Sequence, residues 1–321
     1  MRAGPIPKAW IHAESVPRWI LRGILLLFLL ALTSFAAWWR TGDWRWMRAF
    51  FDYPGVLFFV GCSLLGLRLS YLCWRQFAPG DAIRPAWLLI VLFASSQLAG
   101  GVLAHLLGSE SYLNPLYYLP SGPALIRGAS SVGRLFSPIS MLFLAAGLFR
   151  VVRICRKNGV LAGLKTFDFL LLGIVTVYTT HYLTAVVFSS QHPEGPVTAG
   201  KIVTWMSDPL LCVLLLQAIL IRRSAANMGW GLIARCWVAF TAAIFFTSVG
   251  DIGLWASARS AIPFGLQAAS WYVWYPATAC FAAAPAYQLQ AMLRATHGAV
   301  YDEDLDTVGY QTGRGVWPSH R

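Results

Sequence analysis

Apolar residues occur along the chain in eight long runs, separated by short segments that hold most of the charged residues. A helix needs about 20 apolar residues to cross the hydrocarbon layer of a bilayer, which is about 30 Å thick. Each run reaches about this length, so the pattern predicts eight membrane-spanning helices. Their approximate ranges are 19–38, 54–74, 85–107, 133–154, 166–188, 200–222, 231–256 and 265–292.

The composition agrees with this pattern and excludes several classes of protein. Of the 321 residues, 57% are hydrophobic and 12% are charged, whereas a soluble domain has about 25% charged residues. A soluble enzyme, a disordered chain and a coiled coil are therefore excluded. The fold class that we predict is all-α, a polytopic membrane helical bundle. We expect a cytoplasmic segment at 1–18, an eight-helix transmembrane domain at 19–293 and a cytoplasmic tail at 294–321.

The positive charges predict an orientation for these spans. If the N-terminus lies in the cytoplasm, eight spans place most of the 25 lysines and arginines on the cytoplasmic side, as the positive-inside rule requires. We therefore expect both termini in the cytoplasm, in a multi-pass protein of the bacterial inner membrane. The formal net charge of +12 follows from this topology, so nucleic acid is not an expected partner.

The first outer loop has a pattern of its own. Its sequence, AWWRTGDWRWMRAFFDY, predicts a short helix lying in the membrane interface, with Asp43 as its N-cap. In this interpretation, one face of the helix lies on lipid and carries Trp44, Trp46, Met47, Phe50 and Phe51.

Ionisable side chains inside the predicted spans are the main functional candidates, because charge is costly in hydrocarbon and such residues usually mark functional positions. They are His181 in the fifth span, Asp208 in the sixth and Asp251 in the seventh. At the helical rise of about 1.5 Å per residue, the three lie at similar depths below the outer surface. His105 in the third span lies nearer that surface. The sequence thus predicts an outward-facing polar cavity between spans five to eight.

Hydroxyl and amide side chains accompany these residues in the outer part of the same spans. Three threonines stand three or four residues from one of the ionisable groups, a spacing that places each pair on one side of a helix. An amide adds to them in the eighth span. These further candidates are Thr184, Thr204, Thr247 and Gln267.

The residue types leave several kinds of site open. Polar groups of this kind can simply hydrogen-bond helices to one another, and two carboxylates and an imidazole can share protons and stay neutral. His105 and His181 could ligate one b-type haem. His181, Asp208 and Asp251 also offer ligand types that suit a divalent metal such as zinc, manganese or iron.

Known catalytic motifs are missing from the sequence. No span has a lysine near its centre for a retinal Schiff base. The sequence also lacks HExxH, GxSxG and Walker A patterns. We therefore expect a non-enzymatic module that binds an unidentified small molecule or a partner, as a sensor-like unit or as a subunit of a larger membrane complex.

Two alternatives stay open. The first is a proton- or cation-coupled transporter or channel that uses Asp208 and Asp251. The second is an intramembrane enzyme subunit that depends on a metal, haem or quinone. In each case the expected partners are bilayer lipids and other membrane subunits.

The cysteines do not suggest a disulfide scaffold or a zinc site. All six fall within or beside apolar runs, and none forms a CxxC pair, so we predict buried free thiols. They are Cys62, Cys73, Cys155, Cys212, Cys236 and Cys280.

Overall fold

The structure is a computed structural model that describes residues 15–43, 45–106, 124–187, 207–229, 231–259 and 271–297. Within these ranges the chain is helical and has no strand. Eight long helices are α1 (Val16–Thr41), α3 (Val56–Gln76), α4 (Arg84–Leu106), α5 (Ala124–Lys157), α6 (Thr166–Val187), α8 (Ser207–Asn227), α9 (Leu232–Arg259) and α11 (Trp274–His297). Three short segments complete them: α2 (Arg45–Phe50), the π-helix η2 (Phe51–Gly55) and the 3₁₀-helix η5 (Trp271–Val273).

Each of the eight apolar runs overlaps one of the long helices, and the all-helical character of the described residues confirms the predicted fold class. Among the described residues, five segments are long and apolar enough to cross a membrane: Val16–Thr41, Arg45–Gln76, Pro138–Lys157, Pro209–Asn227 and Leu232–Gly250. These helices indicate an integral membrane protein. The prediction that α4, α6 and α11 also cross, which makes eight spans, stays a prediction.

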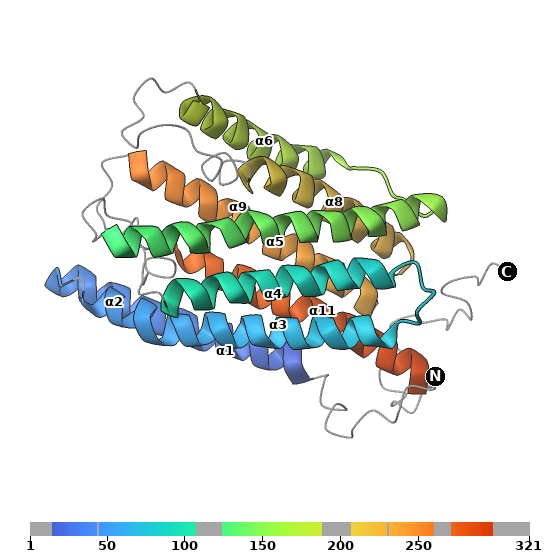
Figure 1. Cartoon of the computed structure of the whole chain (residues 1–321), viewed down its shortest axis with the longest axis horizontal. Coiled ribbons are helices and arrows are strands. Elements are labelled where there is room, and N and C mark those ends of the chain that lie inside the picture. The colour runs from blue at the N-terminus through green and yellow to red at the C-terminus, as the bar shows by residue number, and fades with distance from the viewer. Residues whose placement is uncertain are drawn as a thin grey trace.

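The long helices form one bundle in which successive helices run back and forth (Figure 1). The connections 77–83 and 158–165 lie at one end together with residues 228–229 and 231 between α8 and α9, and we call this the short-connection end. Side-chain contacts agree with this: Trp87 at the start of α4 packs on Phe240 near the start of α9, with ring centroids 6.4 Å apart. Helices α3, α4, α5, α8, α9 and α11 pack on one another, whereas α6 packs on α8 and α1 on α11 at the edges (Figure 1).

The core lies between the inner helices, and apolar side chains also cover the outside. Trp87, Leu144, Leu214 and Ile219 are fully buried in the largest cluster. Leucines and aromatic residues of α1 and α6 are exposed on the outer surface. A water-soluble bundle would not expose so much apolar surface, whereas hydrocarbon chains solvate it at no cost.

Small residues set how closely two pairs of helices approach. A Cβ added at Gly66 of α3 would lie 3.4 Å from the Cα of Ala282 in α11. A Cβ at Gly147 of α5 would lie 3.2 Å from the carbonyl oxygen of Ala86 in α4. Membrane helices gain much of their association energy from such close packing, so these glycines help to fix the positions of α3, α4, α5 and α11.

The segment after α1 corrects one expectation from the sequence. Asp43 Oδ1 does accept a hydrogen bond from the Arg45 N–H, at 3.0 Å. The helix that follows does not lie on lipid with its aromatic face outward, because Met47, Phe50 and Phe51 are buried. Instead, α2 passes through the π-helical turn into α3. Of the other two residues expected on lipid, Trp46 is exposed and Trp44 lies outside the described residues.

The reason is a set of aromatic partners that local periodicity cannot reveal. Phe51 stacks on Tyr272, with ring centroids 5.2 Å apart, and Phe50 meets Tyr275 edge-on at 5.8 Å. Both tyrosines lie at the start of α11 or just before it. A Cβ at Gly55 would collide with the hydroxyl of Tyr275. The π-helical turn therefore lies directly against α11.

The cysteines match the prediction of free thiols. All six are free. Four of them, Cys62, Cys73, Cys155 and Cys236, are buried, and the other two are part-buried. No disulfide contributes to the stability of the bundle.

Candidate functional site

The four ionisable residues that the sequence singled out lie on four different helices. His105 lies near the end of α4 and His181 in the second half of α6, whereas Asp208 lies at the start of α8 and Asp251 in the last third of α9. Because successive helices alternate in direction, all four positions lie toward the end of the bundle opposite the short-connection end (Figure 1). Helices α6, α8 and α9 are neighbours in the order α6–α8–α9.

The structure describes two of the candidate side chains. The Thr247 hydroxyl is buried and donates a hydrogen bond to the Ala243 carbonyl of its own helix, at 2.9 Å. The side chain of His181 is exposed. Of the other candidates, the residues Thr204 and Gln267, and the side chains of His105, Thr184, Asp208 and Asp251, lie outside the described part of the chain.

The two faces of α6 place His181 relative to α8. Among the described side chains of α6, those of Asp168, Val175 and Thr179 are buried, and they share one face. Thr179 Oγ1 lies 3.2 Å from the sulfur of Cys212 in α8, so this face packs on α8. His181 comes two residues after Thr179, about 200° further around the helix. Its side chain therefore points away from α8.

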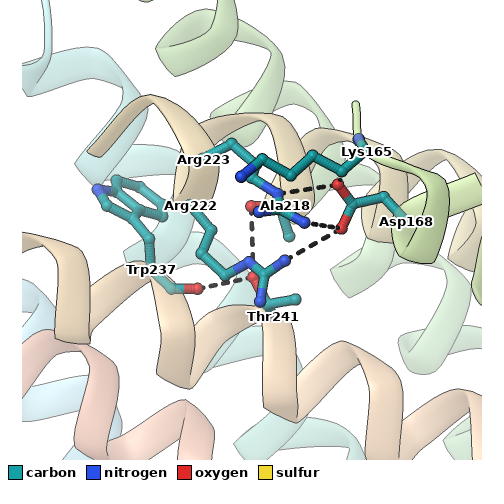
Figure 2. A network of polar contacts seen from close by, with 7 residues as sticks. All are labelled: Lys165, Asp168, Ala218, Arg222, Arg223, Trp237 and Thr241. Carbon is teal, nitrogen blue, oxygen red and sulfur yellow. Dashed lines mark hydrogen bonds and ion pairs between the residues drawn. The ribbon is translucent and has the colours of Figure 1, made fainter. Parts of the chain in front are cut away.

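A different polar cluster lies at the short-connection end, and sequence reasoning missed its central residue. Asp168, in the first turn of α6, has a fully buried side chain. Arg223 of α8 donates two hydrogen bonds to it, from Nε to Oδ2 at 2.8 Å and from Nη2 to Oδ1 at 3.0 Å. Arg222 donates a third from Nη2 to Oδ1 at 3.1 Å. Figure 2 shows both arginines reaching the carboxylate from the same helix.

The start of α6 explains why the carboxylate lies there. The Lys165 N–H donates to Asp168 Oδ2 at 2.9 Å, and the Asp168 N–H donates to the Lys165 carbonyl at 2.8 Å. An acid at the third helical position that bonds back to the residue before the helix is half of a capping box. The carboxylate also faces the positive end of the α6 dipole. The local sequence therefore stabilises the carboxylate in place, and the two arginines neutralise it.

A second contact holds the preceding connection on α8. The Ala162 N–H donates to Ser224 Oγ at 3.0 Å, and this hydroxyl donates to the Leu220 carbonyl at 2.8 Å. Ser224 directly follows the two arginines and is fully buried. The connection 158–165 and the first turn of α6 are thus attached to the last turns of α8. We call Asp168, Arg222, Arg223, Ser224 and the backbone of Lys165 the α6–α8 clamp.

The charges of the clamp do not balance. Two guanidinium groups share one carboxylate, and Arg222 Nε is buried without an acceptor among the described residues. The carboxylate has no exposed surface, whereas the Arg222 and Arg223 side chains keep 26% and 21% of theirs. The clamp therefore has an excess of one positive charge.

Sequence reasoning had one signal that could have found this cluster. Arg222 and Arg223 are among the basic residues that the predicted orientation places on the cytoplasmic side, and Asp168 is an acid near the start of the predicted fifth span. An acid at the cytoplasmic end of one span and an arginine pair at the same end of the next predicted span form a natural ion pair. Only the packing of α6 on α8 decides that they meet.

The predicted metal and haem sites involve four side chains, of which the structure describes that of His181. Among the described side chains, no three His, Cys, Asp or Glu residues lie close enough together to hold a metal ion. The side chains of Asp208, Asp251 and His105, which these two hypotheses require, lie outside the described part of the chain. The His181–Asp208–Asp251 metal site and the His105–His181 haem site stay predictions.

Comparisons with protein-family models, with curated proteins and with solved structures gave no match.

Proposed function

We propose that the chain crosses the membrane eight times, with the short-connection end and both termini on the cytoplasmic side of a bacterial inner membrane. The support is the position of the basic residues. The helix ends and connections at the short-connection end carry Arg75, Arg84, Arg150, Arg153, Arg156, Lys157, Lys165, Arg222, Arg223 and Arg235. Cytoplasmic ends of spans are enriched in lysine and arginine in this way.

Thiol labelling in intact cells tests this orientation. Asn158→Cys places a thiol in an exposed part of the connection 158–165. Thr41→Cys places a matched exposed thiol at the last residue of α1, at the opposite end of the bundle. A membrane-impermeant maleimide should label Thr41→Cys in intact cells and Asn158→Cys only after the membrane is opened. The reverse pattern would overturn the orientation.

We further propose that the protein is a non-enzymatic binding module, either a sensor-like unit or a subunit of a larger membrane complex. Its ligand or partner would contact the outer ends of α6, α8 and α9. One observation carries this proposal: Asp208 and Asp251 lie on the adjacent helices α8 and α9, toward the same end of the bundle, and His181 lies toward that end of α6 although its side chain points away from α8. Ionisable residues at such depth are costly and usually interact with a ligand, an ion or a partner chain.

A second candidate is proton- or cation-coupled transport. The observation that favours it is the position of two carboxylates, Asp208 and Asp251, toward the same end of the adjacent helices α8 and α9. Acids on adjacent helices form proton relays in many transporters. Proton flux into liposomes tests this candidate: Asp251→Asn should abolish the flux if the carboxylates couple it, and equal flux in the variant would exclude coupling through Asp251.

Native mass spectrometry of protein extracted with its surrounding membrane patch tests the binding module. The wild type should carry a bound small molecule or subunit that Asp208→Asn and Asp251→Asn both reduce. Asp81→Asn serves as the matched control, because Asp81 is an exposed acid in the connection 77–83. A wild type that carries only bulk lipid, or equal occupancy in all four proteins, would overturn the proposal.

A further inference from the structure

Two arginines and two aromatic rings are stacked where α3 ends and α4 begins, at the short-connection end (Figure 1). Arg75 lies over the ring of Tyr71, with 5.9 Å between its Cζ and the ring centroid. The rings of Tyr71 and Trp74 follow at a centroid distance of 5.6 Å. Arg84 of α4 lies over the ring of Trp74 at 5.2 Å. We call these four residues the aromatic–arginine ladder, because the ring pair links two positive charges from two helices.

The stacking leaves the hydrogen-bond donors of both arginines unused. A guanidinium group stacks through its flat face, whereas its five N–H donors point outward in the plane of the group. Among the described contacts, no hydrogen bond or ion pair engages a side-chain N–H of Arg75 or Arg84. Arg75 is exposed, and the part-buried Arg84 has no buried nitrogen without a partner. Because the rings already restrict both groups, less conformational entropy is lost when they bind an anion.

The ladder lies at the end of an exposed face of α3. The residues of this face follow one another at a spacing of three or four, which places them on one side of the helix. They are Leu57, Gly61, Leu64, Arg68, Tyr71 and Arg75, and all six are exposed.

The contacts of α3 with α11 confirm which side this is. Gly66 faces Ala282 of α11, and the Cys73 thiol donates to the Pro285 carbonyl at 3.3 Å. Both Gly66 and Cys73 lie about half a turn around α3 from the exposed face. Arg75 therefore shares its face with the exposed apolar residues of the same helix, and this face points away from α11.

The length of the apolar part matches one leaflet of a bilayer. Leu57 and Leu64 are 73% and 51% exposed, and nothing lies within 4 Å of a Cβ added at Gly61. Ten residues separate Gly61 from Tyr71, about 15 Å of helix, which is half of the hydrocarbon layer of about 30 Å. If Gly61 lies near the middle of the bilayer, the ladder lies at the level of the phosphate groups.

The charge around the ladder is positive. Residues 68–84 contain three arginines and one acid, Asp81. The Asp81 carboxylate accepts a hydrogen bond from the Ala78 N–H at 2.7 Å and is not ion-paired with Arg75 or Arg84. An exposed cationic group at the end of an apolar face one leaflet long complements an amphiphile with an anionic head.

We propose that Arg75 and Arg84 bind the head group of an anionic phospholipid, one acyl chain of which lies along Leu64, Gly61 and Leu57. Guanidinium groups suit its phosphate because their N–H donors match the phosphate oxygens in pairs. A soluble anion would make no use of the apolar face, and an acidic protein partner could not reach the part of it that lies in the bilayer. The inference depends on α3 crossing the membrane, and it holds for either orientation of the bundle.

Nanodiscs of defined composition test the proposal with the full chain. The protein is placed in phosphatidylcholine alone or in phosphatidylcholine with added phosphatidylglycerol, and the lipid that it retains after release from the disc is measured by native mass spectrometry. The wild type should retain phosphatidylglycerol preferentially, and this lipid should raise its unfolding temperature. Arg75→Gln should weaken the retention about fivefold, the effect of one arginine at a charged membrane surface.

Further variants separate the ladder from surface charge in general. Tyr71→Leu keeps every charge and the apolar face but removes the ring under Arg75, so it should also weaken retention, whereas Tyr71→Phe keeps the ring and should not. Tyr71→Leu replaces Arg75→Gln if that variant does not fold. Arg235→Gln is the matched control, because Arg235 is exposed at the same end of the bundle, on α9, and this variant should retain the lipid like the wild type. Inorganic phosphate added to phosphatidylcholine discs distinguishes a lipid head group from free phosphate.

Three outcomes would overturn the proposal. The first is equal phosphatidylglycerol retention by the wild type, Arg75→Gln and Tyr71→Leu. The second is a loss in Arg235→Gln as large as that in Arg75→Gln, which would indicate a diffuse surface charge and no defined lipid site. The third is a rise in unfolding temperature with inorganic phosphate that equals the rise with phosphatidylglycerol, which would assign the ladder to a soluble anion.

Discussion

Asp168→Asn is the most direct test of the α6–α8 clamp. The substitution keeps the shape of the side chain and removes its charge. Asparagine can still accept one hydrogen bond from the Lys165 N–H, but its amide group cannot neutralise two guanidinium groups. The positive charges of Arg222 and Arg223 would then repel each other, with no carboxylate between them at this fully buried position. We expect the attachment of α6 to α8 to weaken.

The size of the effect follows from burial. Removing one member of a buried ion pair usually costs about 3–5 kcal/mol, because an uncompensated charge stays behind. Here the arginine side chains keep 26% and 21% of their surface exposed, so the surroundings screen part of the repulsion. We therefore expect the free energy of unfolding to fall by about 2–3 kcal/mol, below the range for fully buried pairs.

Unfolding in mixed micelles, followed by the fluorescence of the 15 tryptophans, measures this change. Asp81→Asn is the control, because Asp81 is exposed and its Oδ2 accepts a hydrogen bond from the Ala78 N–H at 2.7 Å, which an asparagine oxygen can also accept. We expect the control to lie within about 0.5 kcal/mol of the wild type, as for most surface substitutions.

Double-mutant cycles show whether the geometry is the cause. Arg223 makes two of the three side-chain hydrogen bonds to Asp168 and Arg222 makes one, so the coupling energy with Arg223 should be the larger. Arg222→Gln should also partly restore the stability of Asp168→Asn, because it removes one unneutralised charge. Equal stability of Asp168→Asn and the wild type, or stronger coupling with Arg222 than with Arg223, would refute this reasoning.

Three further predictions concern the packing of the bundle. Gly66→Leu should separate α3 from α11 and lower the free energy of unfolding by about 1–3 kcal/mol. Gly61→Leu should unfold like the wild type, because nothing lies within 4 Å of a Cβ added there. Equal losses of stability in the two variants would exclude close packing as the cause. Gln97→Leu removes the 2.7 Å hydrogen bond to the buried Ser140 and should lower the free energy of unfolding by about 0.5–1 kcal/mol, and an unchanged value would contradict a stabilising role for this bond. Ser224→Ala should speed hydrogen exchange in the connection 158–165 without changing the exchange of α11, and a uniform increase over all helices would contradict a local role.

The polar candidates separate into those that sequence reasoning found and the one it missed. His181 and Asp251 were identified because an ionisable residue in an apolar run is conspicuous in one dimension. Asp168 was overlooked because charged residues are common at the ends of apolar runs, and because its partner Arg222 comes 54 residues later in the chain. Which face of α6 packs on α8 was also undetermined, because its polar residues are spread around the helix and do not mark one side.

The sequence by itself determined that the chain is a bundle of long helices with apolar surfaces, and it located each of these helices along the chain. Hydrophobicity summed over about 20 residues is a strong local signal, and each helix satisfies its own backbone hydrogen bonds. The tertiary structure alone decided that Met47, Phe50 and Phe51 are buried against α11, and that Asp168 meets two arginines of α8. Apolar side chains are accepted by lipid and by protein alike, so only the contacts between helices distinguish the buried faces from those that face the bilayer.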